Sequence, residues 1–310
     1  MNVPSSLVAW LAEHAEPFTP VPDATVPGLA SGQRAVVGVG VVTRGTRQLT
    51  QAAHAALATL VRQSGFRAVF LEGTDATGPA LDRYVTRGLG DPEALAARSQ
   101  SFLRTRETVG LLKWLRSYAL AHPDDPVRVV HDREPGRSPS TLEEIEQLLA
   151  RRDLRWHEQT GQRVVHLGGV AHTIAGSPRS LSPWPGPQHS HDNAGARLRR
   201  ALGPGYAAVA VTAGHGRAPF RLPEPDTSMA ESAFSGPGPD CFILDLHADQ
   251  EPPPEAAAWL ARPLRMRCIG PEYDPALDAG YHVDAGPLAD CVDQVIHVRR
   301  VDPATFIGTS

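Results

Sequence analysis

Residues 37–47 read Val-Gly-Val-Gly-Val-Val-Thr-Arg-Gly-Thr-Arg. The apolar, mostly β-branched residues predict a buried strand, and the polar turn after them leads into a helix over residues 47–64. One side of that helix carries an apolar stripe formed by Leu49, Ala52, Ala53, Ala56, Leu57 and Leu60. Side chains beyond the carboxyl end of a buried strand leave the core and face a crevice, so α/β enzymes place their chemistry there. In this sequence the turn carries Arg44, a cation that cannot act as a base near neutral pH.

The same succession of apolar run, turn and amphipathic helix recurs along the chain. A second strong helical pattern covers residues 105–121. Candidate strands cover residues 34–42, 67–71, 127–131, 163–167, 207–212, 241–246, 265–269 and 295–298. Strands that alternate with helices of this length predict an α/β fold, with a mainly parallel sheet flanked by helices.

We expect the 310 residues to form a single domain over residues 1–310, with a helical extension over residues 1–33. Two segments rich in Pro, Gly and Ser, residues 176–193 and 217–240, are predicted to be long surface loops. The Thr-Leu-Glu-Glu sequence that starts at Thr141 is a capping-box pattern and predicts a further helix.

The composition excludes several classes of protein. Thirty basic against 34 acidic residues give a net charge of −4, so no basic excess exists to neutralise nucleic-acid phosphates. No apolar run reaches the ~20 residues that a membrane span needs, and residues 1–20 do not have the pattern of a secretion signal. The three cysteines are widely spaced and offer no disulfide framework, which favours a cytoplasmic protein.

Several motifs follow one another in an order typical of a known family. The first is Gly-Val-Val-Thr-Arg-Gly-Thr-Arg at residues 40–47, and the second is the strand over residues 65–72 that ends in Glu72. Further motifs cover residues 82–85, 104–107, 111–116, 164–173, 242–246, 269–273 and 295–298. Taken together, residues 35–304 resemble the erythromycin esterase family.

The resemblance implies an erythromycin-esterase-like α/β fold and a hydrolase in which a histidine of the first motif activates water to attack an ester. It also implies that a glutamate and later histidines assist, and that a helical insert roofs the cleft. Glu72 and His172 match the family pattern. Arg44 stands where the base histidine is expected, and the insert is reduced to residues 133–162. Further departures from the pattern fall at Val41, Gly169 and His215.

We expect Glu72 and His172 to transfer protons and Arg44 to bind an anionic group of the substrate or stabilise an oxyanion. Each has a structural alternative. Glu72 and Arg44 would form an ion pair that holds Glu72 ionised, and His172 would cap a loop. The expected substrate-binding residues are Arg47, His131 and His215. For His131 the sequence context favours a capped turn over substrate binding, and for Arg47 it favours a structural anchor or a residue that supports its neighbours.

No cofactor or metal is expected from the motifs. Gly38 and Gly40 do not complete a dinucleotide-binding glycine pattern, because Thr43 occupies the last glycine position. The His-Ser-His-Asp sequence at residues 189–192 lacks the spacing of strong zinc motifs and is interpreted as a solvated loop.

Two functional hypotheses remain. The first is an erythromycin-esterase-like enzyme with altered chemistry that acts on a natural-product or peptide-type small substrate, without ordinary macrolide esterase activity. The second is a catalytically inactive homologue that serves as a binding or accessory protein. The polar residues kept at the strand ends favour the enzyme hypothesis, because a site that had lost its function would fill with apolar residues. The sequence does not determine the oligomeric state.

Overall fold

The computed structural model describes residues 3–29, 32–74, 76–131, 139–184, 186, 189–236, 238–247 and 252–308. Within these ranges the main sheet has nine strands, in the order β1-β10-β13-β8-β2-β5-β3-β4, with β9 paired to β8. The pairs from β13 to β4 are parallel, while β1, β10 and β9 pair antiparallel to their neighbours. Its strands are β1 (Glu16–Pro17), β2 (Val36–Val41), β3 (Ala68–Leu71), β4 (Arg128–Val129), β5 (Val164–Gly169), β8 (Tyr206–Arg217), β9 (Arg221–Leu222), β10 (Cys241–Asp245) and β13 (Gln294–Val301). The predicted α/β fold with a mainly parallel sheet is confirmed.

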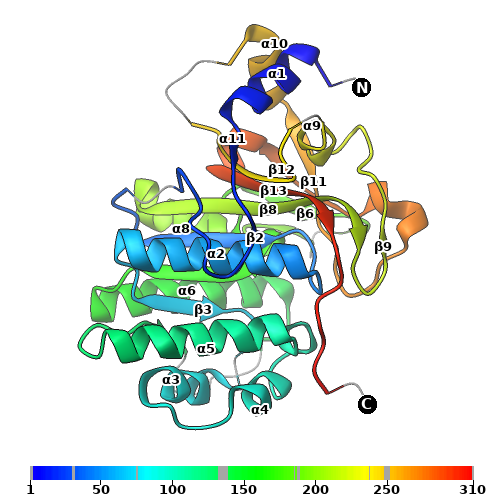
Figure 1. Ribbon diagram of the computed structural model, residues 1–310. Helices are drawn as coiled ribbons and strands as arrows, with labels where there is room; N and C mark the ends of the chain where they lie inside the picture. The colour runs from blue at the N-terminus through cyan, green and yellow to red at the C-terminus, as the bar shows by residue number, and fades with distance from the viewer. Residues whose placement is uncertain are drawn as a thin grey trace.

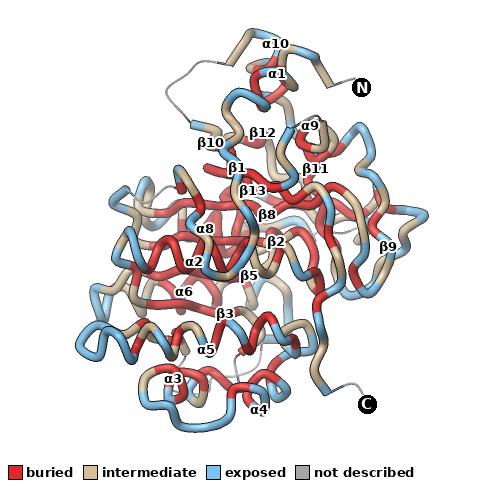
Figure 2. Tube along the Cα trace, in the orientation of Figure 1, coloured by how far each residue is buried: buried red, intermediate tan, exposed pale blue. Residues whose placement is uncertain are grey.

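Helices cover both faces of this sheet (Figure 1). On one face lie α2 (Arg47–Ser64) and α5 (Arg106–Ala121), and on the other α6 (Leu142–Thr160) and α8 (Ala194–Leu202). Successive side chains of β2 point to opposite faces of the sheet. Val37 and Val39 therefore pack in the core beneath α2, whereas Val36 packs in the core beneath α6. Figure 2 shows buried residues concentrated in the central strands and in the helix sides that face them.

A second, smaller sheet has the order β11-β12-β6-β7, and its strand pairs are antiparallel. Its strands are β6 (Arg179–Leu181), β7 (Ser190–His191), β11 (Pro263–Arg267) and β12 (His282–Pro287). The candidate strand at 265–269 therefore belongs to this sheet and not to the main one. Residues 176–193 contain β6 and β7, and residues 217–240 contain β9 and α9 (Glu231–Phe234).

The remaining helices are short. The N-terminal part of the chain forms α1 (Ser5–His14) before β1 joins the edge of the main sheet through β10. The others are α3 (Gly78–Arg87), α4 (Pro92–Ala97), η1 (Ser101–Leu103), α7 (Val170–Thr173), η3 (Gly203–Gly205), α10 (Pro254–Leu260), η4 (Pro275–Gly280) and α11 (Leu288–Cys291). Among the described residues, no helix is long and apolar enough to span a membrane.

The expected insert at 133–162 is described only from residue 139 onward, because residues 132–138 lie outside the described ranges. Thr141 caps α6 by accepting a hydrogen bond from the Glu144 N–H, as the capping-box pattern predicts. Leu149 and Ala150 of α6 pack on the main sheet. This helix therefore forms part of the layer that covers the sheet.

The turn between β2 and α2 is held by a segment from the far end of the sequence, residues 302–306. The Arg47 N–H donates to the Asp302 carbonyl at 2.8 Å, and the Ala304 N–H donates to the Gly45 carbonyl at 2.9 Å. A further β-bridge joins the same segment to the residue before α5. Gly45 has φ +74°, a conformation that favours glycine. The turn that carries Arg44 is thus held in place by backbone hydrogen bonds to residues 302–304.

Candidate active site

Three neighbouring strands, β2, β5 and β3, end at the same edge of the main sheet and carry the candidate residues. Arg44 lies in the turn after β2, Glu72 directly follows β3, and His172 lies in α7 after β5. Arg44 Nη2 is 2.9 Å from Glu72 Oε2, and His172 Nε2 is 3.6 Å from Glu72 Oε1. The structure thus brings these three predicted residues together, with Glu72 between two cationic groups.

The chain of charges continues into the protein on the other side of His172. His172 Nδ1 lies 2.9 Å from Glu146 Oε1 on α6, and the same oxygen accepts a hydrogen bond from Arg179 Nη2 on β6 at 2.5 Å. The side chains of Glu146 and Arg179 have no exposed surface. The second oxygen of Glu146 accepts the Ala194 N–H at 2.8 Å. Arg44, Glu72, His172, Glu146 and Arg179 therefore form one alternating ion-paired network, which we call the charge network.

The charge network determines which groups carry protons. Burial alone would raise the pKa of Glu72, but Arg44, His172 and the Gly169 N–H lower it to about 2. Burial alone would lower the pKa of His172, but the carboxylates of Glu146 and Glu72 raise it to about 9. At neutral pH His172 is an imidazolium that can donate a proton, and Glu72 is an ionised, weak base.

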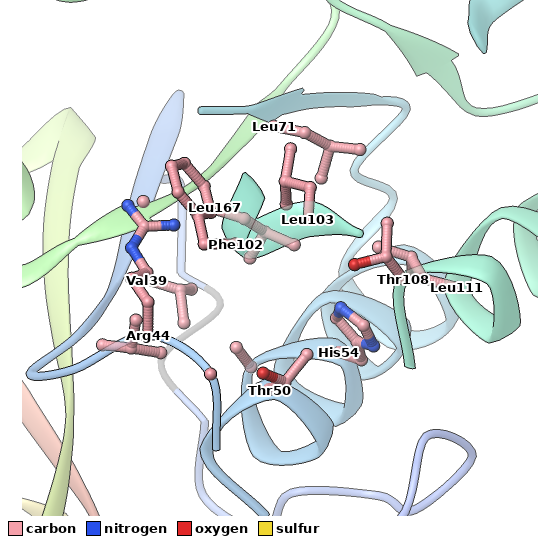
Figure 3. A pocket seen from close by; sticks show the side chains of 14 residues that line it. Val39, Arg44, Thr50, His54, Leu71, Phe102, Leu103, Thr108, Leu111 and Leu167 are labelled. Atoms are coloured by element: carbon pink, nitrogen blue, oxygen red, sulfur yellow. The ribbon is translucent and has the colours of Figure 1, made fainter. Parts of the chain in front are cut away.

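Arg44 also borders a small cavity of about 60 Å³ between the sheet and the helices α2 and α5. Its guanidinium lies 4.2 Å from the ring centre of Phe102, which comes from η1. Figure 3 shows Arg44 on one side of this cavity and the imidazole of His54, from α2, on the other. The side chain of Arg44 is 27% exposed, whereas His54 is only 6% exposed. The cavity therefore extends from the candidate site toward the interior.

A buried histidine–carboxylate pair lies next to Glu72. His166 Nδ1 is 2.7 Å from Asp153 Oδ2, and both side chains are buried. Among the described residues, His166 Nε2 has no hydrogen-bond partner. A Cβ added to Gly168 would lie 2.7 Å from Glu72 Oε2 and 3.0 Å from His166 Nε2. Gly168 is required here because it leaves room for both polar groups.

The other predicted substrate-binding residues lie outside the charge network. Arg47 has its Nε 3.9 Å from Glu107, and its side chain is 46% exposed. His131 Nε2 lies 4.0 Å from an Asp82 oxygen, and its ring packs edge-on against a tryptophan. His215 pairs with Glu224 at 2.9 Å and borders a separate groove that is also lined by Gly216, Arg217, Arg221 and Arg300.

Sequence reasoning missed Glu146, Arg179, Asp153 and His166. The position of His166 in the sequence could have identified it. His166 is two residues before Gly168 near the end of β5, so both residues lie on the same face of that strand. The other three lie on α6 and β6, and only the tertiary structure places them at the site.

In the part of the chain that the structure describes, no group of three or more His, Cys, Asp or Glu residues is arranged to hold a metal ion. A Cβ on Gly40 would lie 2.0 Å from the Thr173 hydroxyl and 2.8 Å from Val170. Gly40 therefore lets α7, and with it His172, approach β2 closely.

Comparisons with known proteins identify relatives of this chain. A family model described as erythromycin esterase matches residues 61–164 and 165–301. A solved structure of a Bacillus cereus protein is 18% identical, with a TM-score of 0.77, over 99% of this chain and 100% of the other. A succinoglycan biosynthesis protein is 15% identical, with a TM-score of 0.74, over 98% of this chain and 99% of the other.

A histidine-to-asparagine mutant of the erythromycin esterase EreC, in its open conformation, is 12% identical. Its TM-score is 0.59, and the match covers 90% of this chain and 93% of that one. At these identities the structural matches establish a shared fold. No match was found among curated proteins.

Proposed function

The chain belongs to the erythromycin esterase family, and on that premise we propose that it is an enzyme of this family with altered chemistry. Its substrate would be a natural-product or peptide-type small molecule that carries an anionic group. The observation that carries the proposal is the charge network at the strand ends, where Glu72 contacts both Arg44 and a protonated His172 beside an accessible cavity.

In this proposal Arg44 binds the anionic group of the substrate. Among the described residues, its ion pair with Glu72 engages Nη2, and a guanidinium carries five N–H donors in a planar fork. The Phe102 ring stacks against the guanidinium and restricts its orientation. Arg44 therefore retains donors for a substrate carboxylate while it holds Glu72 ionised.

His172 is proposed to act as a general acid and Glu72 as a weak base that orients water. During ester hydrolysis, water attacks the carbonyl carbon and the bond to the leaving oxygen breaks. The His172 Nε2 proton passes to that oxygen, and Glu72 receives a proton of the water. A carboxylate with a pKa of about 2 accepts protons poorly. The site is therefore better suited to reactions in which protonation of the leaving group is the harder step.

A second candidate function is a catalytically inactive binding protein. The pairing within the charge network favours this function, because Glu72 and Glu146 each already have a cationic partner within the protein. Such a site would bind an anionic ligand through Arg44 without turning it over.

Hydrolysis assays on a panel of carboxylate-bearing esters, neutral esters, short peptides and a macrolactone would test the proposal. We expect turnover of at least one carboxylate-bearing ester and no macrolactone hydrolysis. We also expect the rate to fall above pH 9, where His172 loses its proton. Glu72→Gln and His172→Gln should each lower kcat/KM by about 100-fold, whereas Arg83→Gln, on an exposed face of α3, should not.

Equal rates in the wild type, Glu72→Gln and His172→Gln would refute the enzymatic proposal. Binding of the carboxylate-bearing esters without turnover would support the binding-protein alternative.

A further inference from the structure

The cavity beside Arg44 has mainly apolar walls, and among the described residues that line it the buried Nδ1 of His54 is unsatisfied, whereas the hydroxyls of Thr50 and Thr108 have partners. Val39 and Leu71 from the sheet and Leu111 from α5 contribute to its walls. His54 borders the cavity from α2, four residues after Thr50, so that both face the same side of the helix. The cavity therefore combines an apolar passage with an imidazole at its buried end.

The Nδ1 atom of His54 is fully buried and has no hydrogen-bond partner among the described residues. Leaving a buried polar atom unpaired is unfavourable. The residues around His54 on α2 are alanines and a leucine, all buried. Burial lowers the pKa of His54 to about 4, so the ring is neutral at physiological pH and offers one donor and one acceptor.

The other end of the cavity favours a single negative charge. The charge network contains three cations, Arg44, His172 and Arg179, and two carboxylates, Glu72 and Glu146. Its net charge at neutral pH is +1, and Arg44 is the member of the network that borders the cavity. One carboxylate at Arg44 would neutralise that charge.

The volume of the cavity limits what can enter. About 60 Å³ corresponds to roughly four water-sized groups, at about 15 Å³ for each. A chain of three methylenes that ends in a hydroxyl has four non-hydrogen atoms. Aromatic rings, sugars and longer chains would not fit.

We propose that this cavity is a binding subsite for a short aliphatic ω-hydroxycarboxylate or the corresponding acyl group. The carboxylate contacts Arg44, the methylenes lie between the apolar walls, and the terminal hydroxyl forms a hydrogen bond with His54. This inference rests on the proposed function and deepens it, since the hydroxy acid released from an ester would lie in the subsite with its new carboxylate on Arg44, whereas in the intact ester Arg44 would contact the acyl carbonyl. Dicarboxylates are disfavoured, because a neutral His54 cannot compensate a second buried charge.

Equilibrium binding to the full-length protein tests this subsite without any turnover. The probes are 4-hydroxybutyrate, butyrate, succinate and hexanoate at pH 7.5 and matched ionic strength. In the wild type we expect 4-hydroxybutyrate to bind about tenfold more tightly than butyrate, and succinate and hexanoate to bind more weakly than both. His54→Leu should reverse the preference, so that butyrate binds more tightly than 4-hydroxybutyrate. His122→Leu, at an exposed histidine remote from the cavity, should leave the ranking unchanged.

A second measurement needs no variant, and so it remains informative if His54→Leu does not fold. In the wild type, 4-hydroxybutyrate should shift the NMR signals of the His54 ring, whereas butyrate should leave the nitrogen resonances nearly unchanged. The same ranking of ligands in the wild type and His54→Leu, or no effect of 4-hydroxybutyrate on the ring, would overturn the inference.

The two proposals fail in different ways. Selective binding of 4-hydroxybutyrate without hydrolysis of any ester would leave the subsite intact and reject the enzymatic function. Ester hydrolysis with no preference for hydroxyacyl groups would reject the subsite and keep the enzymatic function.

Discussion

Replacing Glu146 by glutamine removes one charge from the charge network while almost keeping the shape of the side chain. Glu146 contacts His172 at 2.9 Å, closer than the 3.6 Å contact between His172 and Glu72. The amide can still accept the hydrogen bond from Arg179, but it no longer attracts the imidazolium electrostatically. We therefore expect Glu146→Gln to lower the pKa of His172 substantially.

The expected change in the pKa of His172 follows from how close Glu146 lies to its ring. The pKa of His172 stands at about 9 instead of 6.5, against the opposing effect of burial, which corresponds to about 3 kcal/mol in favour of the charged ring. Since Glu146 is the nearer carboxylate, it provides at least half of this preference. Without it, burial and Glu72 nearly cancel, and we expect a pKa of about 7.

An NMR titration of the His172 ring in the wild type and in Glu146→Gln measures this directly. Glu143→Gln is the matched control, because Glu143 lies on the same helix, is 55% exposed and pairs with Arg197. A His172 pKa that stays near 9 in Glu146→Gln would refute the assignment of the shift to Glu146.

The same substitution has a consequence for stability. Because the folded-state pKa of His172 lies above its unfolded value, its stabilising contribution is complete below pH 6.5 and is lost as the pH rises through 9. The wild type should thus lose about 3 kcal/mol of unfolding free energy over that interval from this group, and Glu146→Gln should lose much less. Urea denaturation at pH 6 and pH 9.5 measures the difference. The variant should also be less stable by about 3 kcal/mol at pH 6, because Arg179 is buried without a carboxylate.

Three further predictions concern other parts of the molecule. Gly168→Ala places a methyl group 2.7 Å from Glu72 Oε2, so kcat/KM on any active ester should fall by about tenfold or more; an unchanged value would show that Glu72 tolerates displacement. Asp82→Asn weakens the paired contacts of 2.9 and 2.6 Å with Arg128 and should lower the unfolding free energy in urea by about 2 kcal/mol, whereas no change would mean that the pair contributes nothing. Burial raises the pKa of all three cysteine thiols to about 12, so a thiol reagent at pH 8 should label the denatured chain and leave the native protein unlabelled.

The part of the site built from strand ends could be predicted from the sequence. The helix predicted over residues 47–64 coincides with α2, because its periodic apolar stripe is a local signal. The convergence of Arg44, Glu72 and His172 followed from a general rule, since parallel strands end at one edge of a sheet. This prediction did not require knowledge of any contact between residues distant in the sequence.

The buried half of the charge network could not be predicted in this way. Glu146 lies in a helix rich in charged residues, and its sequence context does not distinguish it from the exposed Glu143. Arg179 lies in β6, a strand of three residues that is too short for an alternating pattern. Its strand pairs with the nearby β7 and with β12, which comes from a distant part of the chain. The sequence likewise did not indicate a role for His54, because its neighbours on α2 are buried apolar residues.

The backbone contacts between residues 302–306 and the turn after β2 also determine when this turn can reach its final structure during translation. Gly45 and Arg47 obtain backbone partners from Ala304 and Asp302, which are translated more than 250 residues later. At about 5–20 residues per second, a ribosome needs at least ~10 s to cover that distance. Until then, the nascent chain carries Arg44 on a turn that lacks these contacts. The strand and helix beside the turn can form early, but the backbone contacts that hold the turn form only after residues 302–304 have been synthesised.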